Sequence, residues 1–164
     1  MEKPTRELVN AFLEWFRDHP HSAQEDHYAG TLTLENLSLM DRLQFTDHEA
    51  ALARECHAVS FGSMSQRHPV AHESTQAFLN AAKDALKIFD VNLRMDLFTA
   101  EILDEGCQMA DLVKLNDEEI GRVAGLLDLP QGDARSRAEA MCEKYDLDAV
   151  IFTRGERGTA ACTA

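Results

Sequence analysis

The stretch that decides the fold is "ADLVKLNDEE", residues 110–119, where a strand pattern passes directly into a helix pattern. The apolar run around Leu112 and Val113 is typical of a buried strand. Asn116 is a favoured helix N-cap, and Glu119, three residues later, completes a capping box. A strand that leads straight into a capped helix is one unit of an alternating α/β architecture.

The same alternation continues on both sides of this stretch. Strand and helix patterns in strict succession predict a three-layer α/β/α domain with a mainly parallel sheet of four or five strands and right-handed crossovers. The predicted strands are 57–61, 87–93, 111–115 and 148–153, and the predicted helices between them are 72–86, 99–110, 117–129 and 133–145.

The N-terminal part of the chain is patterned differently. "TRELVNAFLEWFRDH" (5–19) has the spacing of an amphipathic helix, and "TLTLEN" (31–36) alternates as a strand does. A capping box then begins at Thr46. We therefore divide the chain into an N-terminal helix and strand segment, 1–44, and a central α/β portion, 45–164. The apolar face predicted for the N-terminal helix consists of Leu8, Phe12, Trp15 and Phe16.

Composition excludes several classes of function. The formal charge is −13, from 29 acidic and 16 basic residues, and there is no basic stripe, so we expect no nucleic-acid partner. Four cysteines without a CxxC pair disfavour a zinc site and a disulfide framework. No apolar run approaches the ~18–20 residues of a membrane span. We expect a soluble, cytoplasmic protein that binds no membrane.

Polar side chains follow the predicted strands at the sheet edge where ligands bind in open α/β sheets. "DVNLR" places Asp90, Asn92 and Arg94 at alternate positions, facing one side of an extended segment. Asn92 and Arg94 would there reach a substrate hydroxyl or phosphate, with Arg supplying a fork of donors. The alternative is an Asp90–Arg94 pair that only satisfies itself at a strand end.

Two further motifs have both a functional and a purely structural interpretation. Asn116 and Glu119 either cap a helix or hold water molecules on a Mg²⁺ ion, which prefers oxygen ligands and keeps several waters. In "TRGERG", Thr153, Gly155 and Gly158 either form an ordinary turn or let backbone N–H groups approach phosphate oxygens. Spacing alone leaves both pairs of alternatives open.

Four segments in order, "AVSFGSMSQR", "KIFDVNLR", "ADLVKLNDEEIGRV" and "DLDAVIFTRGERG", resemble the ribokinase-like (PfkB-type) carbohydrate kinases, especially the fructokinase-like members. The resemblance covers roughly residues 45–160. It implies a ribokinase-like, Rossmann-like fold and transfer of the γ-phosphoryl group of ATP to a sugar hydroxyl, with Mg²⁺. It also implies that Asp90, Asn92 and Arg94 line the cleft near the substrate and the phosphates.

The resemblance assigns roles to the other two motifs as well. Asn116 and Glu119 match the family's Asn-x-x-Glu motif, which organises the metal ion and its phosphate-bound waters. Thr153, Gly155 and Gly158 match the Thr-x-Gly-x-x-Gly motif that lies along the nucleotide.

This sequence also departs from the family pattern. Family members are about twice as long, open with a sugar-binding segment and close with Gly-Ala-Gly-Asp, whose Asp is the catalytic base. Neither segment occurs here, so no residue is assigned as catalytic. We expect a truncated sugar kinase that is inactive alone. The alternative is a non-catalytic binding or self-assembling module, because a truncated sheet exposes a strand edge that a second copy or a partner chain would cover.

Overall fold

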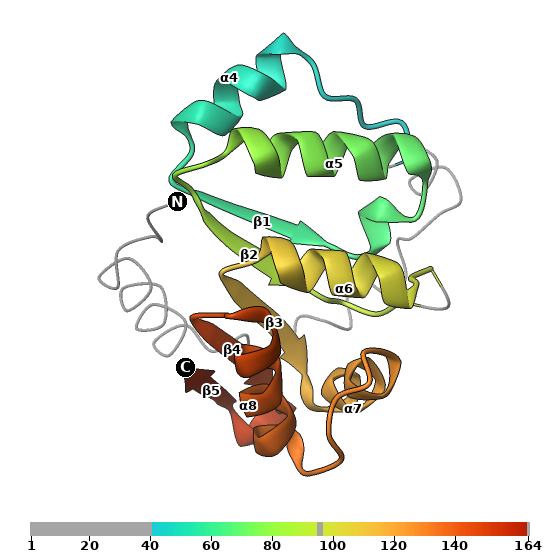
Figure 1. Cartoon of the computed structure of the whole chain (residues 1–164), viewed down its shortest axis with the longest axis vertical. Helices are drawn as coiled ribbons and strands as arrows, with labels where there is room; N and C mark the ends of the chain where they lie inside the picture. Colours follow the sequence, from blue (N-terminus) through green and yellow to red (C-terminus); the bar gives the residue numbers. More distant parts are fainter. Residues whose placement is uncertain (1–40, 95–96, 164) are drawn as a thin grey trace.

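The computed structural model describes residues 41–94 and 97–163, and its centre is a five-stranded sheet in the order β1-β2-β3-β4-β5 (Figure 1). The first four strands are parallel, and β5 runs antiparallel to β4. The predicted α/β fold with a mainly parallel sheet is therefore confirmed. The strands are β1 (Ala58–Gly62), β2 (Leu86–Asp90), β3 (Leu112–Asn116), β4 (Ala149–Thr153) and β5 (Thr159–Thr163).

Helices connect the parallel strands, and most of them begin at a side-chain cap. Thr46, Thr99, Asn116 and Asp133 each accept a backbone N–H of the first helical turn, which stabilises the start of the helix. The helices are α4 (Asp47–Glu55), α5 (Pro69–Ala81), α6 (Ala100–Met109), α7 (Asp117–Leu126) and α8 (Ala134–Tyr145), with 3₁₀ turns η1 (Met64–Gln66) and η2 (Gly155–Arg157).

The prediction of a helix over 72–86 is wrong at both ends. The helix begins earlier, at Pro69, and ends at Ala81. Ala82 and Ala85 continue the apolar pattern because they are buried, but they are buried in the turn that leads into β2 and pack with Ala53 of α4. The buried alanines of this turn therefore have the same spacing as the apolar residues of a helix.

β5 was not predicted at all. Its sequence, "TAACT", contains no large apolar residue, so it carries little strand signal. It forms because Gly158, with a φ of 76°, turns the chain back, and the strand then pairs along β4 from Thr159 opposite Thr153 to Thr163 opposite Ala149. The pairing partner, rather than the local sequence, creates this strand.

The main core lies between the sheet and α5–α8. Phe89 in β2 is completely buried and stacks on Phe61 of β1, with ring centroids 5.1 Å apart. Gly106 of α6 lies over this ring, and a Cβ at that position would be 2.5 Å from it. The helix therefore approaches β2 as closely as a bare backbone allows.

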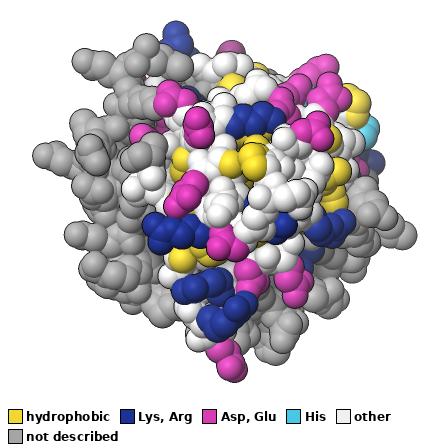
Figure 2. All heavy atoms as spheres, turned by 60° about the horizontal axis from the view of Figure 1, so that its bottom comes forward, with side chains coloured by type: hydrophobic (Ala, Val, Ile, Leu, Met, Phe, Trp, Pro, Cys, Tyr) yellow, Lys and Arg dark blue, Asp and Glu magenta, His cyan; other side chains and the backbone are white. Residues whose placement is uncertain are grey.

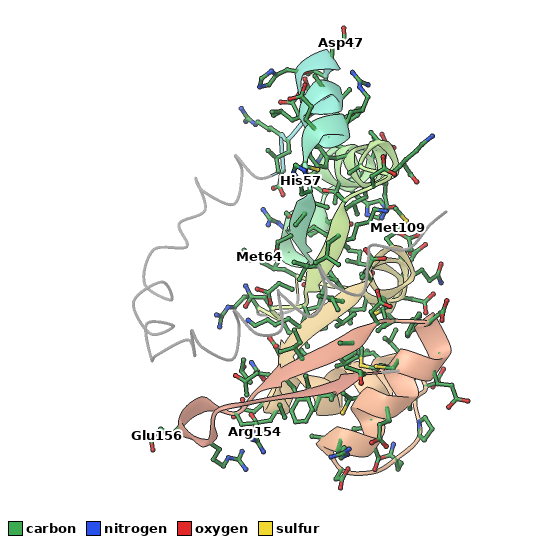
Figure 3. The ribbon with its side chains drawn as sticks, turned by 90° about the vertical axis from the view of Figure 1, so that its left-hand side faces the viewer. Asp47, His57, Met64, Met109, Arg154 and Glu156 are labelled. Atoms are coloured by element: carbon green, nitrogen blue, oxygen red, sulfur yellow. The ribbon has the colours of Figure 1, made fainter. Side chains whose placement is uncertain are left out.

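The opposite face of the sheet carries a separate cluster formed by Leu86, Ile88, Leu112 and Ala149, all strand residues. In Figure 3, α5, α6 and α8 lie on one side of the sheet. The expected helix at 5–19 and strand at 31–36 fall outside the described residues. No helix within the described residues is long and apolar enough to cross a membrane.

Candidate functional site

Asn116 and Glu119 form a complete capping box at the start of α7. The Asn116 Oδ1 accepts hydrogen bonds from the backbone N–H groups of Glu118, at 3.0 Å, and Glu119, at 2.8 Å. In return, the Glu119 Oε2 accepts the N–H of Asn116 at 2.9 Å. The capping interpretation of this motif is therefore confirmed.

The second oxygen of Glu119 reaches the segment that follows β2. Its Oε1 accepts the backbone N–H of Leu93 at 2.7 Å. One carboxylate thus joins the chain that leaves β2 to the junction between β3 and α7. This contact could not be read from the sequence, because the two residues are 26 positions apart.

The segment after β2 departs from the extended geometry expected for it. Regular pairing ends at Asp90, and Asn92 has a φ of 43°, in the left-handed region that Asn tolerates better than most residues. Burial still alternates, since Val91 and Leu93 are buried whereas Asn92 is half-buried and Arg94 exposed. The three polar side chains therefore stay outside the core.

Asp90 does not use Arg94 as its partner. Its carboxylate forms an ion pair with the ammonium group of Lys114, with Nζ and Oδ1 3.2 Å apart, and Lys114 lies directly opposite it in β3. Asp90 therefore does not serve as the partner of Arg94. Lys114 is a residue that the sequence analysis missed, although it shares one face of β3 with Asn116.

The "TRGERG" turn lies beside the other two motifs. Thr153 is the register partner of Asn116, which places the end of β4 next to the start of α7. Gly155 and Gly158 both have positive φ, 57° and 76°, a backbone conformation that favours glycine. Arg157 forms an ion pair with Asp117, which fastens the turn to the first residue of α7.

These contacts bring the three motifs together at the carboxyl ends of β2, β3 and β4. Arg154 and Glu156 mark the turn, which projects beyond the sheet in Figure 3. On the face shown in Figure 2, Lys and Arg side chains lie interspersed with Asp and Glu, without a continuous basic surface. Any anion bound on that face needs a local set of donors rather than a general positive field.

The side chains of the candidate site are better suited to hold a metal ion through its water molecules than to coordinate it directly. Among the described residues, no group of three or more His, Cys, Asp or Glu side chains is placed to hold a metal. Each Glu119 oxygen already accepts one N–H, yet a carboxylate has about four lone-pair sites. The remaining sites can accept hydrogen bonds from metal-bound water, which is how Mg²⁺ is commonly held.

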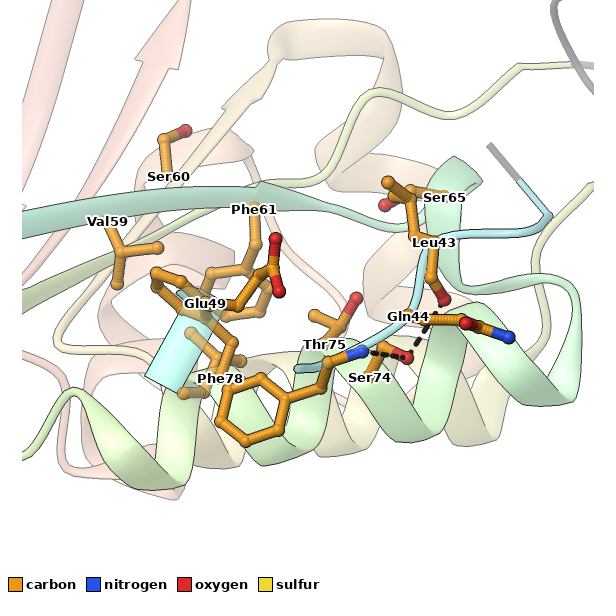
Figure 4. A pocket seen from close by; sticks show the side chains of 12 residues that line it. Leu43, Gln44, Glu49, Val59, Ser60, Phe61, Ser65, Ser74, Thr75 and Phe78 are labelled. Carbon is orange, nitrogen blue, oxygen red and sulfur yellow. Dashed lines mark hydrogen bonds between the residues drawn. The ribbon is translucent and has the colours of Figure 1, made fainter. Parts of the chain in front are cut away.

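A separate pocket of about 280 Å³ lies beside the edge strand β1 (Figure 4). Val59, Phe61, Phe78 and Leu79 make its wall largely apolar. None of the eight candidate residues from the three motifs lines this pocket, so it is a different feature from the candidate site.

Known proteins resemble this chain in sequence and in fold. The sequence model of the pfkB family of carbohydrate kinases matches residues 28–164. A fructokinase from Salmonella thompson is 33% identical over 78 residues, which are 44% of this chain and 33% of that protein. The chain thus matches a third of the length of this curated relative.

Solved structures share the fold. A fructokinase from Xylella fastidiosa with bound ATP superposes with a TM-score of 0.61 at 22% identity, over 75% of this chain and 40% of that chain. An aminoimidazole riboside kinase from Salmonella enterica gives a TM-score of 0.55 at 19% identity, over 64% of this chain and 36% of that chain. With a family match over most of its length and this fold, the chain belongs to the pfkB family of carbohydrate kinases.

Proposed function

We propose that this chain forms the nucleotide-binding side of a fructokinase-like site, in which the γ-phosphoryl group of ATP is transferred to a sugar hydroxyl. The observation that carries the proposal is the double contact of Glu119, which bonds both Leu93 and Asn116. Through it, the segment proposed to face the sugar is fixed relative to the segment proposed to face the phosphates. Phosphoryl transfer depends mainly on such positioning and on electrostatic stabilisation.

The phosphates and their metal ion are assigned to the strand ends of β3 and β4. Thr153, Gly155 and Gly158 would lie along the nucleotide, where the glycines let the backbone approach the phosphate oxygens. Asn116 and Glu119 would hold the waters of a Mg²⁺ ion. When bound, that ion neutralises charge on the phosphate oxygens.

The sugar and the transferred phosphoryl group are assigned to the end of β2. Arg94 is exposed and unengaged by Asp90, so its guanidinium can bind phosphate oxygens with a fork of donors. Asp90 and Asn92 would line the same cleft. The ion pair with Lys114 holds the Asp90 carboxylate in place at the end of β2.

We infer that the chain of 164 residues binds nucleotide without turning it over. No Gly-Ala-Gly-Asp sequence occurs in it, and none of its residues is assigned as the base that accepts the proton of the sugar hydroxyl. A non-catalytic, self-assembling module is the second candidate. It is favoured by β1, which is an edge strand of the sheet in the described part of the chain.

Calorimetric titration with Mg·ATP tests the proposal. We expect binding, and we expect Glu119→Gln to weaken it by at least tenfold, about 1.4 kcal/mol, because the neutral amide is a poorer acceptor for metal-bound water. Glu118→Gln is the matched control, since Glu118 lies in the same helical turn with an exposed side chain. We expect this variant to bind as the unaltered protein does.

Two results would overturn these assignments. Absence of binding at millimolar Mg·ATP, or equal losses in both variants, contradicts the proposed phosphate site. A coupled kinase assay with fructose should show no turnover, and measurable turnover would contradict the inferred lack of catalysis. Light scattering on the same sample tests the second candidate, which requires a dimer or larger assembly.

A further inference from the structure

The sheet has one apolar face that no described helix covers. The cluster on this face consists of Leu86, Ile88, Leu112 and Ala149, and it includes no residue of α4–α8. The side chains that pack against the helices come from the alternate strand positions, such as Phe89 and Val113. The described helices in contact with the sheet therefore use the other face.

This helix-free face is nevertheless shielded from water. Leu86 is 1% exposed, Ile88 8% and Leu112 0%. Ile151, which strand alternation places on the same face, is 1% exposed. Burial of one such side chain contributes about 1.5–3 kcal/mol to the free energy of unfolding. Exposure of all of them to water would therefore remove much of a domain's net stability of about 5–15 kcal/mol.

The chain outside the described residues has a segment of matching character. Leu8, Phe12, Trp15 and Phe16 are spaced i, i+4, i+7 and i+8, which gives a helix one apolar stripe. Helical residues 5–16 would be about 18 Å long. Five strands are about 19 Å wide at about 4.8 Å per strand spacing, so one such helix spans the face.

The connection to the described part of the chain imposes no restriction on this placement. The described part of the chain begins at Asp41. The carboxylate of Asp41 is held by Arg67 at 2.7 Å, just beyond the carboxyl end of β1. Between residue 16 and residue 41 the chain can extend by up to about 80 Å at about 3.3 Å per residue. That reach exceeds the width of the sheet several times.

We propose that residues 5–19 pack the stripe of Leu8, Phe12, Trp15 and Phe16 onto the helix-free face of the sheet in the same chain. The segment is thereby the second helical layer of the domain. The interaction is independent of nucleotide binding, because it uses the face of the sheet rather than the strand ends.

Trp15 makes the proposal directly measurable, since it is the single tryptophan of the protein. In the folded full-length chain we expect its fluorescence emission to be blue-shifted relative to the urea-unfolded chain, and acrylamide to quench it weakly. Emission at the same wavelength in both states, or equally strong quenching, would overturn the proposal.

A nitroxide label then locates the surface that Trp15 contacts. Ser60 is exposed and points away from Val59 on the opposite side of β1 (Figure 4), so a label on Ser60→Cys lies on the helix-free side. Glu139 is an exposed residue of α8, and Glu139→Cys is the matched control on the helical side. Both variants carry Cys56→Ser, because Cys56 is the partly exposed native thiol among the described residues.

We expect the label on Ser60→Cys to remove more than half of the Trp15 emission and the label on Glu139→Cys to remove little. Equal quenching at both positions contradicts the proposal. A mixture of two proteins distinguishes the same chain from a second copy as the occupant of this face. One protein is unlabelled and keeps Trp15, and the other carries Trp15→Phe together with the label on Ser60→Cys. Quenching in that mixture would mean that a second copy covers the face, which overturns packing within one chain.

Discussion

Glu119 illustrates how one side chain can serve the fold and a candidate site together. Its two carboxylate oxygens accept the N–H groups of Leu93 and Asn116, which would otherwise lack these partners. A relative that had lost all use for phosphate would still gain stability from this pair of contacts. The presence of the motif therefore indicates the fold more strongly than it indicates catalysis.

Glu119→Ala should lower the free energy of unfolding by about 1–3 kcal/mol, because it leaves two backbone donors without a side-chain acceptor. Urea unfolding measures this difference. Glu118→Ala is the matched control, since it removes an acid from the same first turn, and its exposed carboxylate should contribute only about 0.5 kcal/mol. Losses of equal size in the two variants would show that the bridge between the strands contributes nothing.

The partner of Asp90 shows why the sequence could not predict the site in full. Arg94 lies four residues beyond the end of β2, after Asn92 has turned the chain out of the extended conformation, whereas register partners on adjacent strands are about 4.8 Å apart. Asp90 therefore pairs with Lys114 of β3 rather than with Arg94. The capping of α7 was predictable because both partners lie within one turn, but contacts across strands depend on a register that sequence spacing does not contain.

At the scale of elements, the close contact between α6 and β2 depends on Gly106. A Cβ there would meet the buried ring of Phe89 at 2.5 Å. We expect Gly106→Ala to lower the free energy of unfolding by about 1–3 kcal/mol through overpacking, as measured by urea or thermal unfolding.

Gly125 in α7 provides the matched control for that substitution. No atom lies within 4 Å of the position that a Cβ would take there. Gly125→Ala should therefore raise the free energy of unfolding by about 0.5–1 kcal/mol, through helix propensity alone. If both substitutions changed stability in the same direction, the proposed contact with Phe89 would not be the cause.

The elements themselves were predictable to the extent that local sequence determines them. The strand and the cap around Asn116 are predicted by the ten residues 110–119, and α6 and α8 begin within one residue of their predicted start. The end of α5 and the whole of β5 were not recognised. Ala82 is buried by α4, and Thr159–Thr163 is a strand only because β4 lies beside it, so both depend on tertiary contacts.

At the scale of the whole molecule, alkaline pH should weaken the folded state. Burial, together with the nearby Asp104 carboxylate, raises the pKa of the Cys107 thiol from 9.0 to about 12. Burial is also the main cause that raises the pKa of Cys142 to about 11. The pKa of Tyr145 is raised by burial and by the hydrogen bond that its hydroxyl donates to Asp104 at 2.6 Å.

The folded state favours the protonated form of all three groups. Their contribution to stability is therefore complete below about pH 9 and is lost as the pH rises through the folded-state values of about 11 and 12. Urea midpoints should stay level up to about pH 9 and then fall as the pH rises to about 11. Cys107→Ala removes one titrating group, so its midpoint should fall less steeply. An equal slope would show that Cys107 does not contribute.

The sequential order of the sheet has a consequence for how the chain folds. Each strand from β2 to β5 pairs with the strand that precedes it in the sequence. A chain that emerges from the ribosome therefore always presents the completed edge that its next strand requires, so the sheet can grow in the direction of synthesis without waiting for distant segments. Such an order favours early, local pairing and keeps the search for strand partners short.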